Sequence, residues 1–156
     1  NNSVAGLNKS DIDKLYNVGY IAGVFDLFHI GHLNMFKRAK EQCRYLIVGV
    51  VSDEGVRLNK QAEPFVPFDE RIEMVRSCKY VDEAIKLPLD FCGTRDMFKI
   101  YHFDVQFSGS DYEHDPAWLA EKEFLEKNGS TMVFFPYTQS TSSTKLKRAI
   151  ENRINN

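Results

Sequence analysis

Two histidines three residues apart, His29 and His32, are the side chains of this sequence best suited to chemistry. They follow an apolar, β-prone run at residues 20–24 and begin a stretch whose apolar residues recur at helical spacing. Residues three apart share one face of a helix, so both imidazoles can point at one ligand. The first turn of a helix also presents backbone N–H groups and the positive end of the dipole, which attract anions. The pair therefore predicts a phosphate site.

Imidazole donors suit nucleotidyl transfer in particular. Attack on an α-phosphate builds negative charge on the phosphate oxygens, and donors placed there stabilise the transition state more than the ground state. Gly31, between the histidines, keeps side-chain bulk away from the ligand. Two alternatives stay open at this point. The histidines could be ordinary cap and surface residues, or they could bind zinc, although no cysteine or further histidine lies nearby at ligand spacing.

The surrounding sequence alternates strand-prone and helical segments. The apolar run at residues 45–51 is typical of a strand buried in a parallel sheet. This alternation predicts an α/β protein with a Rossmann-like, doubly wound parallel sheet in a single domain, with ligands bound at the carboxyl ends of the strands. Both histidines follow such an end. The expected strands are residues 20–24, 45–51, 80–85, 105–107 and 133–135, and the expected helices are residues 29–40, 68–78, 96–101, 116–128 and 142–152.

The composition is that of a small protein with one core. With 156 residues, 43% of them hydrophobic, the chain can bury one substantial core, and we expect the domain to span residues 19–152. Residues 1–18 stand outside the pattern as an N-terminal extension, in which Ser10 could cap a short helix through Tyr16.

Charge and cysteine content limit the partners and the compartment. The 20 basic residues are dispersed and balanced by 22 acidic ones, so we expect no nucleic-acid partner. The three cysteines are odd in number and widely spaced, which favours a reduced, cytoplasmic setting over a disulfide scaffold. No apolar run approaches 18 residues and no signal-peptide pattern is present, so neither secretion nor membrane insertion is expected.

Four segments together resemble a known family. The first, Gly23 to His32, reads Gly-Val-Phe-Asp-Leu-Phe-His-Ile-Gly-His and resembles the His-x-Gly-His signature of the nucleotidyltransferase superfamily. The other three are Val51-Ser52-Asp53-Glu54 followed by Lys60, Phe68-Asp69-Glu70-Arg71, and Cys78-Lys79-Tyr80-Val81-Asp82-Glu83. They resemble cytidylyltransferases that act on glycerol 3-phosphate, phosphocholine or phosphoethanolamine. The resemblance covers nearly all of residues 19–150 and implies that Gly23, Val24, Phe25, Asp26 and Gly31 help to bind the nucleotide.

The resemblance also singles out basic residues. It implies that Lys60, in a flexible loop after the second strand, contacts the phosphates and could close over the triphosphate; Arg57 is the alternative. Arg71 would bind phosphate or form a structural ion pair. Lys79 stands where these enzymes usually have arginine, and Arg95 lies near their basic residue for the acceptor phosphate. Each of these side chains could instead belong to a solvated polar surface.

Two later segments resemble further motifs of the family. Ser108-Gly109-Ser110-Asp111-Tyr112 resembles a Gly-Asp-Asp-Trp segment; Gly109 would approach the nucleotide, and Asp111 could hold an acceptor hydroxyl, an ammonium or magnesium. Tyr112 and Trp118 could stack on a quaternary ammonium. A simple Asp-containing turn is the alternative.

The second of these segments, residues 136–145, resembles Arg-Thr-Glu-Gly-Ile-Ser-Thr-Thr. Its hydroxyls could cap the last helix and bind phosphate oxygens. Tyr137 replaces the arginine of the motif, so Lys145, Lys79 or a partner subunit would have to supply that cation, or nucleotide affinity would be reduced. The nucleotide-binding hydroxyls expected here are Thr138, Thr141, Ser142, Ser143 and Thr144.

The sequence thus predicts an enzyme that transfers CMP from CTP to the phosphate of a small alcohol or amino alcohol and releases pyrophosphate. His29 and His32 would bind the α- and β-phosphates, Lys60 the end of the triphosphate, and Mg²⁺ the remaining charge. One alternative is an adenylyltransferase that uses ATP and a sugar-phosphate or flavin-type acceptor. Another is a regulatory module that binds nucleotide without turnover. Related enzymes are commonly homodimers, so the resemblance implies a homodimer.

Overall fold

A parallel β-sheet forms the centre of the computed structural model, which describes residues 14–89, 93–136 and 143–155. Within these residues the strand order is β3-β2-β1-β4-β5, and every neighbouring pair is parallel. Gly23 pairs with Val50 and Gly109 pairs with Phe135, so the carboxyl ends of four strands meet at one edge. The strands are β1 (Tyr16–Gly23), β2 (Cys43–Val51), β3 (Glu83–Leu87), β4 (Val105–Gly109) and β5 (Thr131–Phe135).

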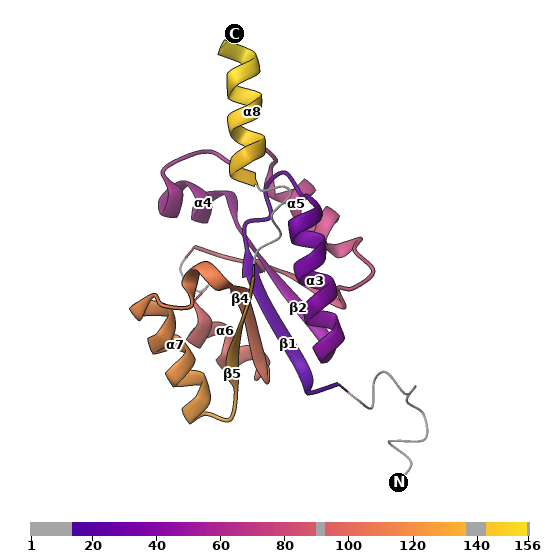
Figure 1. Ribbon diagram of the computed structural model, residues 1–156, viewed down its shortest axis with the longest axis vertical. Helices are drawn as coiled ribbons and strands as arrows, with labels where there is room; N and C mark the ends of the chain where they lie inside the picture. The colour runs from indigo at the N-terminus through magenta and orange to yellow at the C-terminus, as the bar shows by residue number, and fades with distance from the viewer. Residues whose placement is uncertain (1–13, 90–92, 137–142, 156) are drawn as a thin grey trace.

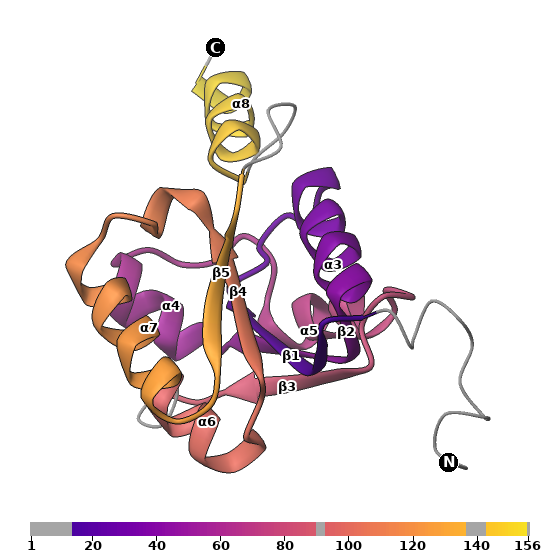
Figure 2. The ribbon, with the colours of Figure 1, turned by 60° about the horizontal axis from the view of Figure 1, so that its bottom comes forward.

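Helices cover both faces of this sheet, as Figures 1 and 2 show for α3 and α5 on one face and α6 and α7 on the other. Phe36 and Val75 belong to the core on the first face, and Met97 and Leu125 belong to the core on the second. The doubly wound α/β fold in a single domain is therefore confirmed. The helices are α3 (Ile30–Gln42), α4 (Asp53–Lys60), α5 (Phe68–Arg76), α6 (Thr94–Tyr101), α7 (Pro116–Lys127) and α8 (Ser143–Asn155), and a short 3₁₀ helix spans Ser110–Tyr112.

Local sequence signals explain where α7 begins and ends. The Asp115 side chain accepts a hydrogen bond of 2.9 Å from the Ala117 N–H, and Pro116 occupies the first turn, where its missing N–H costs nothing. Gly129 follows the helix with a φ of +84°, which L side chains rarely adopt. The prediction of this helix from its proline and glycine is confirmed.

Two predicted boundaries are wrong. Tyr16 opens β1, so a helix running through Tyr16 is excluded and residues 16–18 belong to the sheet rather than to an extension. The expected flexible loop after β2 is the helix α4, because Ser52 caps it through a 3.1 Å hydrogen bond from the Gly55 N–H. Residues 1–13, which include Ser10, lie outside the described residues. No helix in the described part of the chain is long and apolar enough to span a membrane.

Candidate active site

The loop between β1 and α3 has an unusual backbone that brings the histidines to the sheet edge. Phe25 and Leu27 have φ values of 57° and 50°, in the left-handed region that such side chains rarely occupy. A Cβ on Gly23 would lie 2.7 Å from Cζ of Phe25, so only glycine leaves room for this ring. The Phe25 ring packs on Phe36, with centroids 5.2 Å apart. Gly23 thus makes space for a side chain of the loop.

His29 and His32 cap α3 reciprocally. His29 is the N-cap residue, and its Nδ1 accepts a 3.0 Å hydrogen bond from the Gly31 N–H. Nδ1 of His32 accepts a 3.2 Å hydrogen bond from the His29 N–H. This is the capping-box arrangement, with imidazoles where Ser or Thr and Glu or Gln usually stand. An imidazole that accepts through Nδ1 carries its proton on Nε2, so each ring keeps an Nε2–H donor for a ligand.

Both imidazoles are held neutral. Burial lowers the pKa of His29. Burial, together with the repulsion that two protonated imidazoles would have at this distance, lowers the pKa of His32 to about 3. The rings lie nearly parallel, with centroids 3.8 Å apart and planes 29° apart. Two backbone N–H groups of the first turn are already used by the imidazoles, so the donors left for a phosphate include the two Nε2–H groups.

Asp26 lies in the same loop and is almost fully buried, with 2% of its surface exposed. Its carboxylate accepts hydrogen bonds of 2.8 and 2.9 Å from the backbone N–H groups of Phe65 and Val66, and Lys147 Nζ lies 2.9 Å from Oδ2. Burial raises the pKa of this carboxyl, but the hydrogen bond from Lys147 and those from the two backbone amides outweigh burial, so the pKa is lower than usual. Asp26 is therefore an anion that orders the loop.

Arg71 has a structural position beneath the site. Its side chain has no exposed surface, and Nη2 lies 2.6 Å from the Asp53 carboxylate. Its Nε donates to the Val66 carbonyl, and Nη1 donates to the carbonyls of Val24 and Val51. The guanidinium thereby joins the ends of β1 and β2 to the segment before α5. The expected structural ion pair of Arg71 is therefore confirmed, and contact between Arg71 and a nucleotide stays a prediction.

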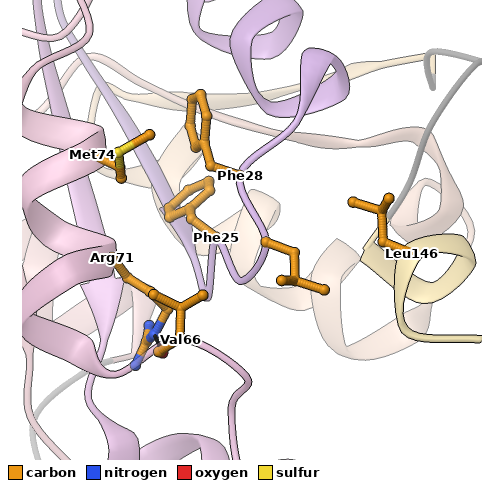
Figure 3. Close-up of a pocket in the computed structure, with 7 residues that line it drawn as sticks. Phe25, Phe28, Val66, Arg71, Met74 and Leu146 are labelled. Carbon is orange, nitrogen blue, oxygen red and sulfur yellow. Dashed lines mark hydrogen bonds between the residues drawn. The ribbon is translucent and has the colours of Figure 1, made fainter. Parts of the chain in front are cut away.

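An apolar hollow of about 280 Å³ lies beside the histidine loop. In Figure 3, Phe25 and Phe28 stand on one side of it and Leu146 of α8 stands across the gap, while the nitrogens of Arg71 are turned toward Val66. The rings of Phe25 and Phe28 also contact His32, with centroids 5.4 and 5.3 Å away. An apolar part of a ligand bound at the histidines would fit here.

Gly109 ends β4 at the same sheet edge as the histidine loop, as expected. Asp111 follows it in the 3₁₀ helix and is exposed. Tyr112 stacks on Trp118, with centroids 4.4 Å apart, so these two rings contact each other.

Arg95 pairs with α7. Its Nε lies 3.2 Å from the Glu121 carboxylate, and its guanidinium lies 4.7 Å from the centre of the Phe124 ring. These contacts join α6 to α7 and account for Arg95 as a residue of the helix interface. Binding of an acceptor phosphate by Arg95 stays a prediction.

Lys60 and Lys79 lie in different parts of the structure. Lys60 is the last residue of α4 and is exposed. Lys79 lies between α5 and β3, close to Asp82, whose N–H donates to the Leu46 carbonyl in the first half of β2. This connection is at the amino end of the strands, whereas the histidines are at the carboxyl end. Within one chain Lys79 is therefore separated from the histidines, because α5 carries the chain back across the sheet, and nucleotide binding by Lys79 stays a prediction.

Comparison with known proteins identifies the family of this chain. Residues 20–149 match the family described as cytidylyltransferase-like. The chain belongs to the cytidylyltransferase-like family. The predicted membership of the nucleotidyltransferase superfamily is therefore confirmed.

Relatives of this cytidylyltransferase-like chain include both FAD synthases and cytidylyltransferases. The FAD synthase of Thermococcus kodakarensis is 36% identical over 139 residues, which cover 86% of this chain and 89% of that protein. The ethanolamine-phosphate cytidylyltransferase of Dictyostelium discoideum is 34% identical over 138 residues, which cover 86% of this chain and 38% of that protein. The chain therefore spans less than half of the second relative. In a solved structure, the lipopolysaccharide core biosynthesis protein of Thermoplasma volcanium GSS1 is 25% identical, with a TM-score of 0.65 over 81% of this chain and 99% of that one.

Part of the predicted site falls outside the described residues of this cytidylyltransferase-like chain. Thr138, Thr141 and Ser142 lie in residues 137–142, as does Tyr137. Ser143 opens α8, and Thr144 is exposed in its first turn. Sequence reasoning missed Lys147, whose pairing with Asp26 becomes visible only in three dimensions. Its one signal was a second lysine two residues after Lys145 in the final helix.

The described residues contain no group of three His, Cys, Asp or Glu side chains that could hold a metal ion. A Mg²⁺ ion that arrives on the triphosphate, with water and phosphate oxygens as its other ligands, needs no such group. Such an ion belongs to the nucleotide substrate and is not a resident cofactor of the protein.

Proposed function

We propose that this chain transfers CMP from CTP to the phosphate of a small alcohol or amino alcohol, such as glycerol 3-phosphate, phosphocholine or phosphoethanolamine, and releases pyrophosphate. The observation that carries the proposal is the pair of neutral imidazoles, each with an Nε2–H donor, at the start of α3. The family and the ethanolamine-phosphate cytidylyltransferase among the relatives support the cytidylyl half of the proposal.

The reaction is an in-line displacement at the α-phosphorus. An ionised oxygen of the acceptor phosphate forms the new P–O bond, and the bond to the bridging oxygen breaks with its electron pair leaving on pyrophosphate. His29 and His32 donate hydrogen bonds to oxygens on which negative charge grows, which lowers the barrier. The acceptor is already an anion, so no general base is required. Lys60, exposed at the end of α4, would meet the departing pyrophosphate as a point charge.

Neutral histidines have a specific advantage here. A charged imidazolium would bind the triphosphate ground state tightly, whereas a neutral donor gains most where charge develops. The site also needs no change of histidine protonation during the reaction, because Nδ1 stays engaged in the cap. Because the pKa of His32 is about 3, we expect protonation of His32 to have no effect on the rate between pH 6 and 8.

A second candidate is adenylyl transfer from ATP to a flavin-type acceptor. It is favoured by the FAD synthase among the relatives and by the apolar hollow next to His32, which would accept a flat aromatic group. The two candidates share the histidines and differ in the base and the acceptor.

The test is pyrophosphate release by the purified chain with Mg²⁺ and either CTP or ATP, crossed with glycerol 3-phosphate, phosphocholine, phosphoethanolamine, sugar phosphates and FMN. Release with CTP and one small phosphorylated alcohol is the expected result. Release only with ATP and FMN would replace the first candidate by the second. Nucleotide binding without release for any pair would overturn both and leave a regulatory nucleotide-binding module.

A further inference from the structure

Three segments far apart in the sequence meet at the Asp26 carboxylate. One is the loop that carries Asp26 itself, three residues before His29. The second is the segment after α4, whose Phe65 and Val66 N–H groups donate to Asp26 over 2.8 and 2.9 Å. The third is α8, whose Lys147 Nζ lies 2.9 Å from the same carboxylate. A single buried anion therefore connects the histidine loop, the segment that follows Lys60, and the final helix.

The charge balance at Asp26 makes Lys147 important. Asp26 has 2% of its side chain exposed, while Lys147 has 28%, so the lysine reaches in from the surface. Arg71 lies close by, but its guanidinium is engaged by Asp53 and by backbone carbonyls. An uncharged side chain in place of Lys147 would remove one charge-assisted hydrogen bond from a buried carboxylate, which weakens the anionic form that holds the Phe65 and Val66 amides.

The final helix, α8, contacts the rest of the protein through residues of its first turns. Figure 1 shows α8 projecting beyond the rest of the molecule from the carboxyl edge of the sheet. Leu146 stands at the apolar hollow across from Phe25 and Phe28 (Figure 3), and the Lys147 ammonium also lies 5.4 Å from the centre of the Phe65 ring. Lys147 thus contacts both the carboxylate and the segment that the carboxylate orders.

We propose that Lys147 is a positioning residue that, through Asp26, couples the docking of α8 to the order of the segment after Lys60 and so sets the affinity for the nucleotide. The part that concerns nucleotide affinity rests on the proposed function. The part that concerns coupling stands on the contacts alone. When α8 is docked, the Phe65 and Val66 amides are held; when the ion pair is lost, those amides and the first turns of α8 become mobile together.

Hydrogen–deuterium exchange of the full chain tests the coupling without any substrate. The variants are Lys147→Met, which keeps the length of the side chain, Lys147→Arg, which keeps the charge, and Arg153→Met, which removes an exposed cation from the same helix. We expect Lys147→Met to speed exchange at Phe65 and Val66 by about ten- to hundredfold, the range that one charge-assisted hydrogen bond supports. Lys147→Arg and Arg153→Met should exchange as the wild type does. Unchanged exchange at Phe65 and Val66 in Lys147→Met would overturn the proposal.

Kinetics then test the functional part with the nucleotide and acceptor that the wild type uses. Lys147→Met should raise the nucleotide KM about tenfold or more while kcat changes much less, and Lys147→Arg should restore KM. Faster exchange with an unchanged KM would overturn the positioning role and leave a structural ion pair. If the wild type itself is inactive, the proposed function fails while the exchange result still decides the coupling. If Lys147→Met does not fold, Lys147→Gln, whose amide can still donate to Asp26 but carries no charge, replaces it in both assays; faster exchange at Phe65 and Val66 is again expected, and unchanged exchange overturns the proposal.

Discussion

Acid should destabilise this protein through His32 in a way that can be calculated. The pKa of His32 is about 3 in the folded chain because of burial and the nearby His29. An unfolded histidine has a pKa of about 6.5. The unfolded chain therefore takes up a proton at His32 below about pH 6.5, whereas the native chain does so only near pH 3. The contribution of neutral His32 to the free energy of unfolding is therefore fully present above about pH 6.5 and is lost as the pH falls toward 3.

The expected size follows from this window. At pH 5, which is about 1.5 units below the pKa of an unfolded histidine, the free energy of unfolding is lower by about 1.4 kcal/mol for each unit. The total loss is about 2 kcal/mol. For a domain of this length, that corresponds to a fall in Tm of about 4–8 °C. The variant His32→Gln should not show this loss of stability in acid. Glutamine still accepts the His29 N–H in a capping box but does not titrate.

The assay is urea unfolding at pH 7 and pH 5 for the wild type and His32→Gln, with His114→Gln as a control that leaves His32 in place. We expect the wild type and the control to lose about 2 kcal/mol more than His32→Gln between the two pH values. Equal losses in all three proteins would show that His32 accepts a proton in the native state, and the neutral-donor argument would then be refuted.

Further changes test the surrounding structure. Arg71→Met should lower the free energy of unfolding by about 3 kcal/mol or more, because buried carbonyls lose their donor; a urea midpoint close to that of the wild type would contradict this. Gly23→Ala should cost about 1–3 kcal/mol, since its Cβ would meet the Phe25 ring at 2.7 Å, and thermal melts should show partial recovery when Phe25→Leu is added. Lys79→Ala should leave the nucleotide KM within about twofold while Lys60→Ala raises it; the reverse order in steady-state kinetics would show that the sheet edge has been assigned wrongly.

The sequence was sufficient for the fold because its signals are local. The run at residues 45–51 and the Pro116 start of α7 follow directly from burial on both faces and from helix capping. The helix α4 was missed because residues 53–60 are mostly polar, and Ser52 decides the outcome through a cap that needs only one hydrogen bond. Strand register decides which residues lie at the same edge of the sheet, and register could not be deduced from the sequence.

The site could be predicted where residues are neighbours in the chain and not where folding joins them. His29 and His32 share one helical turn, so their approach follows from spacing alone. Lys79 follows α5, and its place at the amino end of the strands depends on the return path of that helix, which local spacing does not indicate. Arg71 could be singled out as a phosphate ligand or an ion-pair residue, but only its contacts with Val24, Val51 and Val66 show the structural role. The pairing of Lys147 with Asp26 crosses most of the chain and has no local signature.

The central claim is that the imidazoles of His29 and His32 act as neutral donors in nucleotidyl transfer, and one double variant tests it most directly. His29→Asn with His32→Gln replaces the imidazole box with an ordinary capping box, so α3 should still form. Pyrophosphate release under the wild type's best conditions should fall by at least about 10²–10³-fold, the loss typical for one such donor, while urea stability at pH 7 stays near that of the wild type. Release at close to the wild-type rate from this folded variant would contradict the account.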